Sequence, residues 1–348
     1  MIWFWLGFFA LVALLLFLDL GVLHRRATEP SLRSAVAWTV GWICLGLSFS
    51  GVVYLIYEHA WLGAQMTSAP AHGRAVGVVP SGGGGSDAAI TYVSAYLLEQ
   101  ALSIDNIFVM SLLFRSFRVP IKYQHRVLFW GILGAIVFRV VMLGGGAYLA
   151  HRFTWIFYVF GAYLAWQGIK LFRESDEEGG EHDRSFALRT LRRFVRIVDG
   201  DHGGKFTVRI DGRRALTTVA VCLVVIELTD IVFALDSIPA VLSVSQDTFI
   251  MVTSNIFAIL GLRSLYFVLA GAMSKFKYLK MALAVLLVLI GAKMIAHDLY
   301  AMSHALSLAL IAGIIGVGIL ASVIANRRAD RRAADGGAAE ATDGTGDR

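Results

Sequence analysis

The chain has 348 residues, of which 57% are hydrophobic and only 16% are charged. This balance, with a mean hydropathy of +0.68, excludes a soluble globular domain and predicts a polytopic membrane protein. The formal net charge of +6 does not indicate a nucleic-acid partner, because the basic residues lie between hydrophobic runs, where they are better explained as topology signals.

Nine hydrophobic runs are long enough to cross a bilayer, which takes about 20 residues. The first, MIWFWLGFFALVALLLFLDLG, has its basic residues after it and no small-residue cleavage site, so we expect a transmembrane helix rather than a signal peptide. The expected fold is therefore all-α, with about nine transmembrane helices. The predicted spans are residues 1–23, 34–57, 90–114, 126–149, 153–172, 215–243, 249–273, 279–298 and 304–325.

Basic residues distinguish the two sides of the membrane. The connections after the first, third, fifth, seventh and ninth spans are rich in lysine and arginine, whereas the alternate connections contain only Arg74 and Arg152. By the positive-inside rule, we expect the N-terminus outside and the C-terminus in the cytoplasm.

Three features outside the charged loop are not predicted to carry a catalytic, redox or binding function. The outer loop, residues 58–89, contains SGGGGSD and has the composition of a flexible linker. Cys44 and Cys222 lie in apolar runs without a CxxC pattern, so they are expected to be buried hydrophobic side chains without a redox role. The tail, residues 326–348, is rich in Ala, Gly, Asp and Arg and is predicted to be disordered.

The cytoplasmic loop, residues 173–214, is strongly charged. It ends in KFTVRIDGRRAL, where Asp211-Gly212 between short β-prone runs predicts a small hairpin. Its acidic and histidine residues are expected to be solvated and not to hold a metal; these are Glu181, His182, Asp183 and His202.

A repeated acidic motif lies in two of the spans. EQALSIDNIFV (99–109) and DIVFALDSIPAV (230–241) both read as an acid, five residues, Asp, a polar residue and Ile. In each half, the next span holds one arginine in its interior, Arg139 or Arg263, and the span after that holds GIK or GAK. From arginine to lysine is 31 residues in one copy and 30 in the other, so the match extends over three helices.

The predicted topology makes these two units face opposite ways. Because the span at 90–114 runs inward and the span at 215–243 runs outward, the units form an inverted-topology repeat, which in transporters places the substrate site at the midplane. Asp105 and Asp236 are then related by the pseudo-two-fold axis. The predicted organisation is helices at 1–57, the outer loop at 58–89, repeat 1 at 90–172, the charged loop at 173–214, repeat 2 at 215–298, a last helix at 299–325 and the tail at 326–348.

The polar side chains of both motifs offer oxygen atoms. Carboxylates inside a span face a polar interior, where they pair with basic groups or bind cations. Hard oxygen ligands suit Mn²⁺, Mg²⁺ or Ca²⁺ rather than Cu⁺ or Zn²⁺, and this chemistry alone does not rank the three. The predicted metal ligands are Glu99, Asp105, Asn106, Glu227, Asp230, Asp236 and Ser237.

The basic residues of the spans leave an alternative open. The five acidic residues among the predicted ligands and the three bases Arg139, Arg263 and Lys293 have a summed charge of −2, which a divalent cation would neutralise. Alternatively, the acids pair with these bases as buried ion pairs between helices, a reading that weighs most for Glu227. Asp19 has no repeat partner and fits a water-facing helix end as well as an ion pathway.

Helical geometry limits how one motif can bind one ion. At about 100° per residue, Glu99 and Asn106 lie nearly on one face, and Asp105 lies about 120° away. Pro239 cannot donate to the carbonyl of Leu235, so it is expected to kink or interrupt its span and release a backbone oxygen.

These motifs resemble the TerC family of integral membrane proteins, which is related to the LysE-type transporter group. The resemblance implies a bacterial inner-membrane protein of metal-ion homeostasis, associated with Mn²⁺ efflux and tellurium resistance, in which the predicted metal ligands handle the ion. It rests on DLGVLHRR (19–26), EQALSIDNIFV (99–109), KFTVRIDGRRALTT (205–218), IELTDIVFALDSIPAVL (226–242) and TSNIFAILGLRSLYFVLAG (253–271).

We therefore expect a secondary transporter that exports Mn²⁺, with proton antiport as the hypothesis for its energy source. The expected partners are the transported ion and the lipid bilayer, with a second copy or another membrane protein left open, and no prosthetic group is expected. The alternative is a non-transporting membrane partner in tellurium or envelope stress resistance, or in metal loading of exported proteins. An enzyme is not expected, because neither repeat contains a nucleophile with a base partner, an HExxH motif or a phosphate-binding glycine loop.

Overall fold

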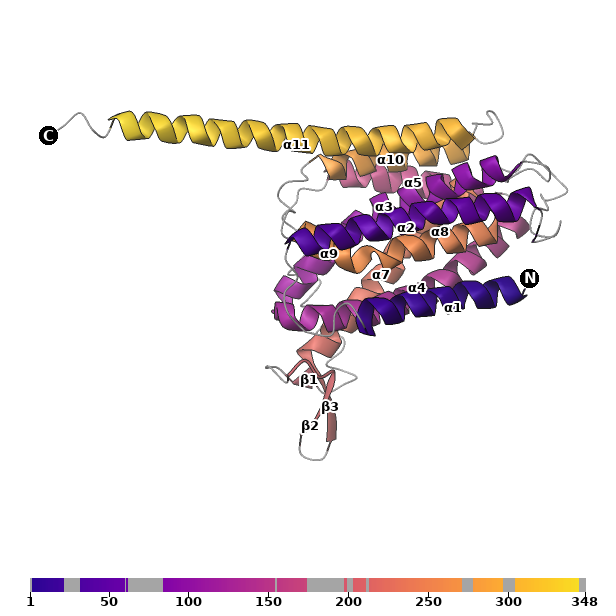
Figure 1. Ribbon diagram of the computed structural model, residues 1–348, viewed down its shortest axis with the longest axis horizontal. Coiled ribbons are helices and arrows are strands. Elements are labelled where there is room, and N and C mark those ends of the chain that lie inside the picture. Colours follow the sequence, from indigo (N-terminus) through magenta and orange to yellow (C-terminus); the bar gives the residue numbers. More distant parts are fainter. Residues whose placement is uncertain are drawn as a thin grey trace.

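The protein is a bundle of long helices with one small sheet at one end (Figure 1). The computed structural model describes residues 2–21, 32–59, 61, 84–153, 155–173, 197–198, 203–210, 213–270, 278–296 and 304–343. The helices are α1 (Ile2–Gly21), α2 (Leu32–Glu58), α3 (Gly85–Ser116), α4 (Ile121–Arg152), α5 (Ile156–Arg173), α7 (Thr218–Val244), α8 (Thr248–Leu260), α9 (Leu262–Ala270), α10 (Leu279–Ile295) and α11 (His304–Asp343).

The all-α polytopic membrane architecture is confirmed, but the number of clear spans is smaller than predicted. All nine predicted runs fall on helices. In the described part of the chain, six helices are long and apolar enough to cross a membrane, and the bent pair of α8 and α9 adds a seventh. The other two, α5 and α10, have 18 and 17 residues, a length of about 25 to 27 Å that falls just short of a typical hydrocarbon core.

The turn between α3 and α4 is a compact helix stop. Arg118 has φ of 51°, and the backbone N–H groups of Arg118 and Val119 donate to the carbonyls of Arg115 and Phe114. This is the Schellman arrangement that satisfies the last carbonyls of a helix. Pro120, the N-cap of α4, cannot continue α3, so a new helix begins at Ile121.

The helix breaks lie elsewhere than the sequence predicted. Pro239 lies inside α7, which is not divided there, so an interruption of this span is wrong and the expected kink stays a prediction. The broken span is the next one, where α8 ends at Leu260 and α9 continues at an angle of 44°. At the break, a Cβ on Gly261 would lie 3.3 Å from Trp42 of α2, so the bend lies where α2 packs closely against this glycine.

Helices α5 and α10 approach each other through glycine. A Cβ on Gly161 would lie 2.8 Å from the carbonyl oxygen of Gly291, and a Cβ on Gly168 would lie 2.7 Å from that of Ala284. Residue numbers rise on one helix as they fall on the other, so the helices are antiparallel. If Gly168 corresponds to Gly291, as their GIK and GAK motifs suggest, Gly161 corresponds to Ala284 and a two-fold rotation exchanges the two contacts.

The predicted hairpin is present in a three-stranded sheet of order β1-β3-β2. Strand β1 (Ile197–Val198) is parallel to β3 (Arg213–Thr217), and β2 (Thr207–Ile210) is antiparallel to β3 with Ile210 opposite Arg213. Strand β3 leads directly into α7, whose first turn is capped by the Thr217 hydroxyl accepting from the Ala220 N–H. The sheet is therefore joined to the helix that carries the second acidic motif.

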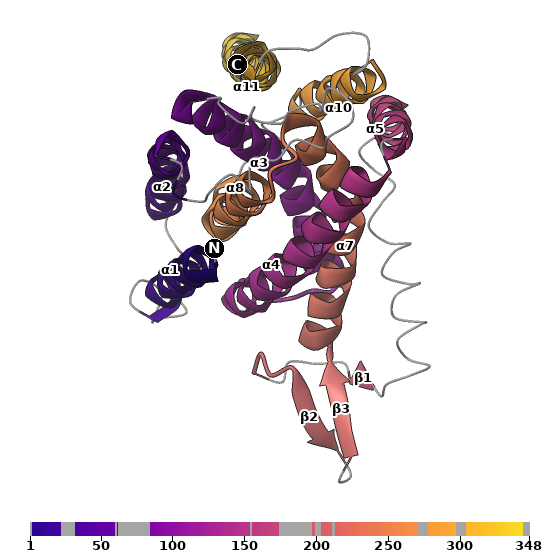
Figure 2. The same ribbon diagram turned by 90° about the vertical axis from the view of Figure 1, so that its right-hand side faces the viewer.

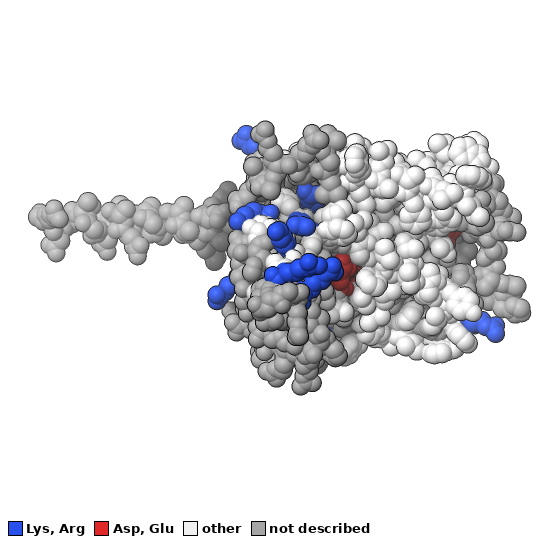
Figure 3. Space-filling model, turned by 90° about the horizontal axis from the view of Figure 1, so that it is seen from below, with Lys and Arg blue, Asp and Glu red and all other residues white. Residues whose placement is uncertain are grey.

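The two ends of the bundle differ in charge. Figure 3 shows lysine and arginine side chains gathered at the end from which α11 extends, and mostly uncharged surface along the middle of the molecule. Helix α11 continues to Asp343, so the structure has helix over most of the tail that the sequence predicts to be disordered from residue 326. Its composition explains the difference, because alanine and arginine are among the strongest helix formers.

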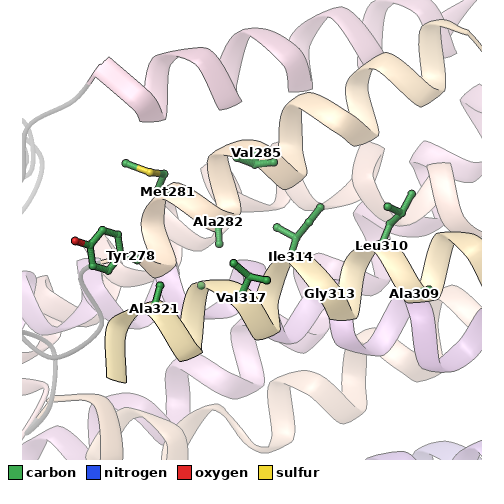
Figure 4. Close-up of a pocket in the computed structure, with 11 residues that line it drawn as sticks. Tyr278, Met281, Ala282, Val285, Ala309, Leu310, Gly313, Ile314, Val317 and Ala321 are labelled. Carbon is green, nitrogen blue, oxygen red and sulfur yellow. The ribbon is translucent and has the colours of Figure 1, made fainter. Parts of the chain in front are cut away.

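An apolar groove of about 460 Å³ lies between α10 and α11 (Figure 4). Met281 and Val285 line it from α10, and Leu310 and Ile314 line it from α11. Such a lining offers no ligand to a metal ion, so the groove is not a candidate for the predicted cation site.

Candidate functional site

The two acidic motifs meet inside the bundle at an arginine. Arg139 of α4 is ion-paired through Nη1 with Oε1 of Glu99 on α3. The same guanidinium reaches Asp230 on α7, with Nη2 3.2 Å from Oδ1 and Nε 3.4 Å from Oδ2. The exposed fractions are 0% for Glu99, 1% for Arg139 and 4% for Asp230, so this ion-paired group is fully enclosed.

Two amide side chains complete this group. Asn106 Nδ2 lies 3.5 Å from Asp230 Oδ1 and donates to it, and Asn255 Oδ1 of α8 accepts from Arg139 Nη1 at 3.4 Å. We refer to Glu99, Asn106, Arg139, Asp230 and Asn255 as the Arg139 cluster. With both carboxyl groups ionised its formal charge is −1, and it joins α3, α4, α7 and α8.

Helical geometry explains why two residues of one motif take part. Glu99 and Asn106 are seven positions apart on α3 and therefore lie on nearly one face, as predicted. That face is turned towards α4 and α7, where Glu99 meets Arg139 and Asn106 meets Asp230.

Several buried polar atoms near these motifs have hydrogen-bonding capacity left. Within the described residues, no hydrogen-bond partner is found for Glu99 Oε2, Ser103 Oγ, Ser237 Oγ or Asn255 Nδ2. Buried polar groups normally have a partner, because an unsatisfied one costs roughly 1–3 kcal/mol. Three of these four atoms are oxygens, which suits a cation as well as water.

Glu227 lies one helical turn before Asp230 on α7 and is half-buried. Its carboxylate lies over Gly134 of α4, so close that a Cβ on this glycine would collide with it. Its Oε2 has no hydrogen-bond partner among the described residues. Glu227 therefore does not form the ion pair that the sequence left as its alternative, within the part of the chain that is described.

The structure describes the backbone of the two repeated aspartates but not their side chains. Helices α3 and α7 run through Asp105 and Asp236, but the side chains of both lie outside the described residues, so their role as ligands stays a prediction. Across the side chains that are described, no group of three or more His, Cys, Asp and Glu residues lies close enough to hold a metal.

The second arginine does not join the cluster. Arg263 was expected among the central charges, but its Nη1 lies 3.0 Å from Oδ2 of Asp19 and its Nη2 lies 3.3 Å from Nδ1 of His125. Its position after the break at Gly261 explains the difference, because α9 leaves the line of α8. Asp19, which had no partner in the repeat, is buried in this second ion pair.

Lys293 also lies apart from the cluster. Its Nζ donates to the carbonyl of Ser243 and to Oγ of Ser307, each at 3.1 Å. It therefore joins α10 to the end of α7 and to α11 and does not neutralise a carboxylate of the Arg139 cluster through these contacts.

The structure adds Asn255 and Ser103 to the predicted residues. Asn255 is a polar residue inside an apolar run and follows the motif by one span, and this signal could have identified it. Ser103 lies four positions after Glu99 on the same helix face, but a serine inside a helix usually bonds to its own backbone, so its type alone carries little information.

The sequence matches known membrane proteins over nearly its full length. The family model described as "Integral membrane protein TerC family" matches residues 84–332. The chain is 40% identical over 331 residues to "Uncharacterized membrane protein STKORF319" of Myxococcus xanthus, covering 95% of each chain. It is 38% identical over 329 residues to the Escherichia coli K12 protein named "Putative membrane-bound redox modulator Alx", covering 94% of this chain and 96% of that one. No solved structure is significantly similar.

Proposed function

Because the chain belongs to the TerC family of integral membrane proteins, we propose that it is a secondary transporter that exports divalent metal cations, with Mn²⁺ as its substrate. The observation that carries the proposal is the Arg139 cluster, in which acids from two separate helices are buried around one basic group. Buried intramembrane acids are typical of ion pathways. Their oxygen chemistry supports a hard divalent ion, and the choice of Mn²⁺ rests on the family resemblance.

In this proposal Arg139 is the counter-charge that a metal ion replaces. The guanidinium compensates Glu99 and Asp230 while no cation is bound. A divalent ion that displaces it gains both carboxylates, together with the oxygens of Asn106 and Ser237 and, through the same motifs, Asp105 and Asp236. When the ion leaves, Arg139 returns, so that the buried acids are not left without a positive partner.

Alternating access would come from two inverted repeats, α3 to α5 and α7 to α10, that rock around this site. The antiparallel packing of α5 on α10 supports this arrangement, since its close contacts are exchanged by a two-fold rotation. The gathering of basic side chains at one end (Figure 3) supports an inner-membrane orientation with that end and the C-terminus in the cytoplasm.

The test is transport by purified protein in liposomes that contain a Mn²⁺-sensitive dye. We expect the wild type to move Mn²⁺, and Asp230→Asn and Glu99→Gln to lower the rate by roughly tenfold or more, as when a group that organises a metal site is lost. Asp87→Asn, which removes a carboxyl from the first turn of α3, is the matched control and should transport normally. A wild type that moves no divalent ion would refute the proposal.

The energy source needs a separate measurement in the same liposomes. Carboxyl groups in a low-dielectric site can exchange a metal for protons, so we expect an imposed pH gradient to drive Mn²⁺ uptake. Equal Mn²⁺ rates with and without the gradient would exclude proton antiport while leaving transport itself intact.

A redox role is the second candidate, because the name of the Escherichia coli relative refers to one. Both cysteines are free, and a catalytic dithiol requires a pair. The predicted burial is confirmed for Cys222 but is wrong for Cys44, which is exposed. A Cys44→Ser, Cys222→Ser double variant that no longer supports tellurium or envelope stress resistance in cells while it still transports Mn²⁺ would favour a redox role.

A further inference from the structure

The hairpin of β2 and β3 places two positively charged arginines opposite each other. Arg209 of β2 and Arg214 of β3 are directly opposite each other in the antiparallel register, so their side chains leave the sheet on the same face. Both are exposed, and neither guanidinium has a hydrogen bond or an ion pair among the described residues. Like charges directly opposite each other on a sheet destabilise the strand pair.

A third exposed basic residue lies close by in the chain. Residues two apart on a strand point to one side, so Thr207 and Arg209 share a face, and Lys205 lies just before the strand at the base of the hairpin. Lys205 is exposed as well. We refer to Lys205, Arg209 and Arg214 as the hairpin basic face.

The base of the sheet is fixed to the bundle. Arg126 of α4 donates to the carbonyl of Gly204 at 3.2 Å and stacks over the ring of Phe206 at 4.9 Å. Gly204 itself has φ of +69° and abuts the ring of Tyr123, so no larger residue fits there. The hairpin basic face is therefore held in a defined place relative to the helices.

That place is beside the bundle. Figure 1 shows the sheet below the bundle, to one side of the long helices and at the end where α9 lies, and Figure 2, which looks down α11, shows it at the lower end of α7, into which β3 leads. Because the long helices would cross a bilayer along their common direction, a projection to one side of them at the end of the bundle would lie along the membrane surface, near the lipid headgroups.

We propose that the hairpin basic face binds the phosphate headgroups of anionic phospholipids in the leaflet at this end of the bundle. A phosphate placed between Arg209 and Arg214 accepts hydrogen bonds from both guanidinium groups and removes their repulsion. Each basic side chain near an anionic membrane surface strengthens binding to that surface by roughly fivefold. The lipid therefore stabilises the paired hairpin over its opened form, as any ligand of the folded state does.

The experiment is amide hydrogen exchange of the full-length protein in nanodiscs, measured on the peptides that cover residues 203–217. For the wild type we expect exchange to slow by roughly five- to twentyfold when neutral phosphatidylcholine is replaced in part by phosphatidylglycerol. For Arg209→Gln with Arg214→Gln we expect protection already in neutral lipid, because the repulsion is gone, and no further slowing in anionic lipid. Arg209→Glu, which places a carboxylate opposite Arg214, should behave in the same way.

The control is Arg327→Gln with Arg328→Gln, an equal charge change at exposed positions of α11, which should keep the full response to anionic lipid. Three results would overturn the proposal: no lipid dependence in the wild type, an unchanged dependence in the Arg209 and Arg214 variant, or equal protection from inorganic phosphate added to neutral discs. The last would assign the face to a soluble anion. None of these outcomes depends on whether the protein transports Mn²⁺.

Discussion

The guanidinium of Arg139 on α4 donates to both carboxylate oxygens of Asp230 on α7, across 91 positions of the chain. The same side chain is paired with Glu99 on α3. One fully buried basic group therefore holds together the two acidic motifs, and this makes it the most sensitive single position of the site.

Replacing Arg139 with glutamine should leave Glu99 and Asp230 buried without a positive partner. Breaking a buried pair in this way costs roughly 3–5 kcal/mol, so we expect a markedly lower unfolding temperature in detergent. Mn²⁺ should raise that temperature more in Arg139→Gln than in the wild type, because the ion no longer competes with the guanidinium. Arg139→Lys, which keeps the charge, is the folded control, and an equal Mn²⁺ response in all three proteins would contradict the role of Arg139 as a replaceable counter-charge.

Asp19 and Arg263 should prove to be an energetic pair that ties α1 to α9. Their side chains are only 11% and 6% exposed and lie 3.0 Å apart, so each single change, Asp19→Asn or Arg263→Gln, leaves one buried charge behind. We expect the double variant to lose less stability than the sum of the two, with a coupling of about 0.5–3 kcal/mol in a double-mutant cycle of unfolding. If the losses of unfolding free energy in the two single variants simply add in the double variant, the ion pair has no coupling energy and the prediction is wrong.

The sequence predicted the membrane class and the hairpin well because each depends on local composition or a short pattern. Glu99 and Asn106 were also placed correctly on one face, since a seven-residue spacing fixes their direction on any helix. The partner of Arg263 could not be predicted in this way. It depends on the break at Gly261, which lies in an apolar run without proline and is next to Trp42 of a different helix.

The effect of Pro239 also could not be predicted from the sequence alone. Proline removes one backbone hydrogen bond and usually bends a helix, yet α7 continues through it. Neighbouring helices can tolerate proline inside a membrane span, and sequence alone does not reveal which neighbours are present. Asn255 was missed as a site residue for a related reason, because its contact with Arg139 requires α4 and α8 to be side by side.

Gly134→Ala should test the role of Glu227 without changing Glu227. A methyl group at this position collides with the carboxylate of Glu227, which is the flexible end of its side chain and can move away at modest cost. If that carboxylate belongs to the ion path, Mn²⁺ transport in liposomes should fall while the unfolding temperature changes little. Gly144→Ala, at a position of the same helix with open space beside it, should transport normally, and equal rates for both variants would remove Glu227 from the path.

Gly291→Val should separate α10 from α5. Its Cβ would lie 2.7 Å from the backbone nitrogen of Ala165 and as close to the carbonyl of Gly161, and backbone cannot move aside as a side chain can. Overpacking of this kind costs typically 1–3 kcal/mol, which we expect as a lower unfolding temperature. Gly313→Val on α11 meets open space and is the control, so a comparable loss there would mean that the α5–α10 contact is not what the substitution disrupts.

Asp247 should make stability fall as the pH rises. The carboxylate caps α8 by accepting from the N–H groups of Phe249 and Ile250 and accepts from the Tyr57 hydroxyl at 2.6 Å. Burial nevertheless raises the pKa of Asp247 above its ordinary value, and these hydrogen bonds lower it only in part. Because the folded state then binds the proton more tightly than the unfolded state, stability is greatest below the ordinary aspartate pKa of about 4 and decreases as the pH rises through the raised value.

Asp247→Asn keeps the cap and the Tyr57 contact without the charge, so its unfolding temperature should lose this pH dependence, whereas Asp247→Ala should lose about 1 kcal/mol of capping as well. Thermal unfolding across this pH range measures both effects, with Asp87→Asn as the control that keeps the dependence, and a pH profile of Asp247→Asn that follows the wild type would exclude Asp247 as its source.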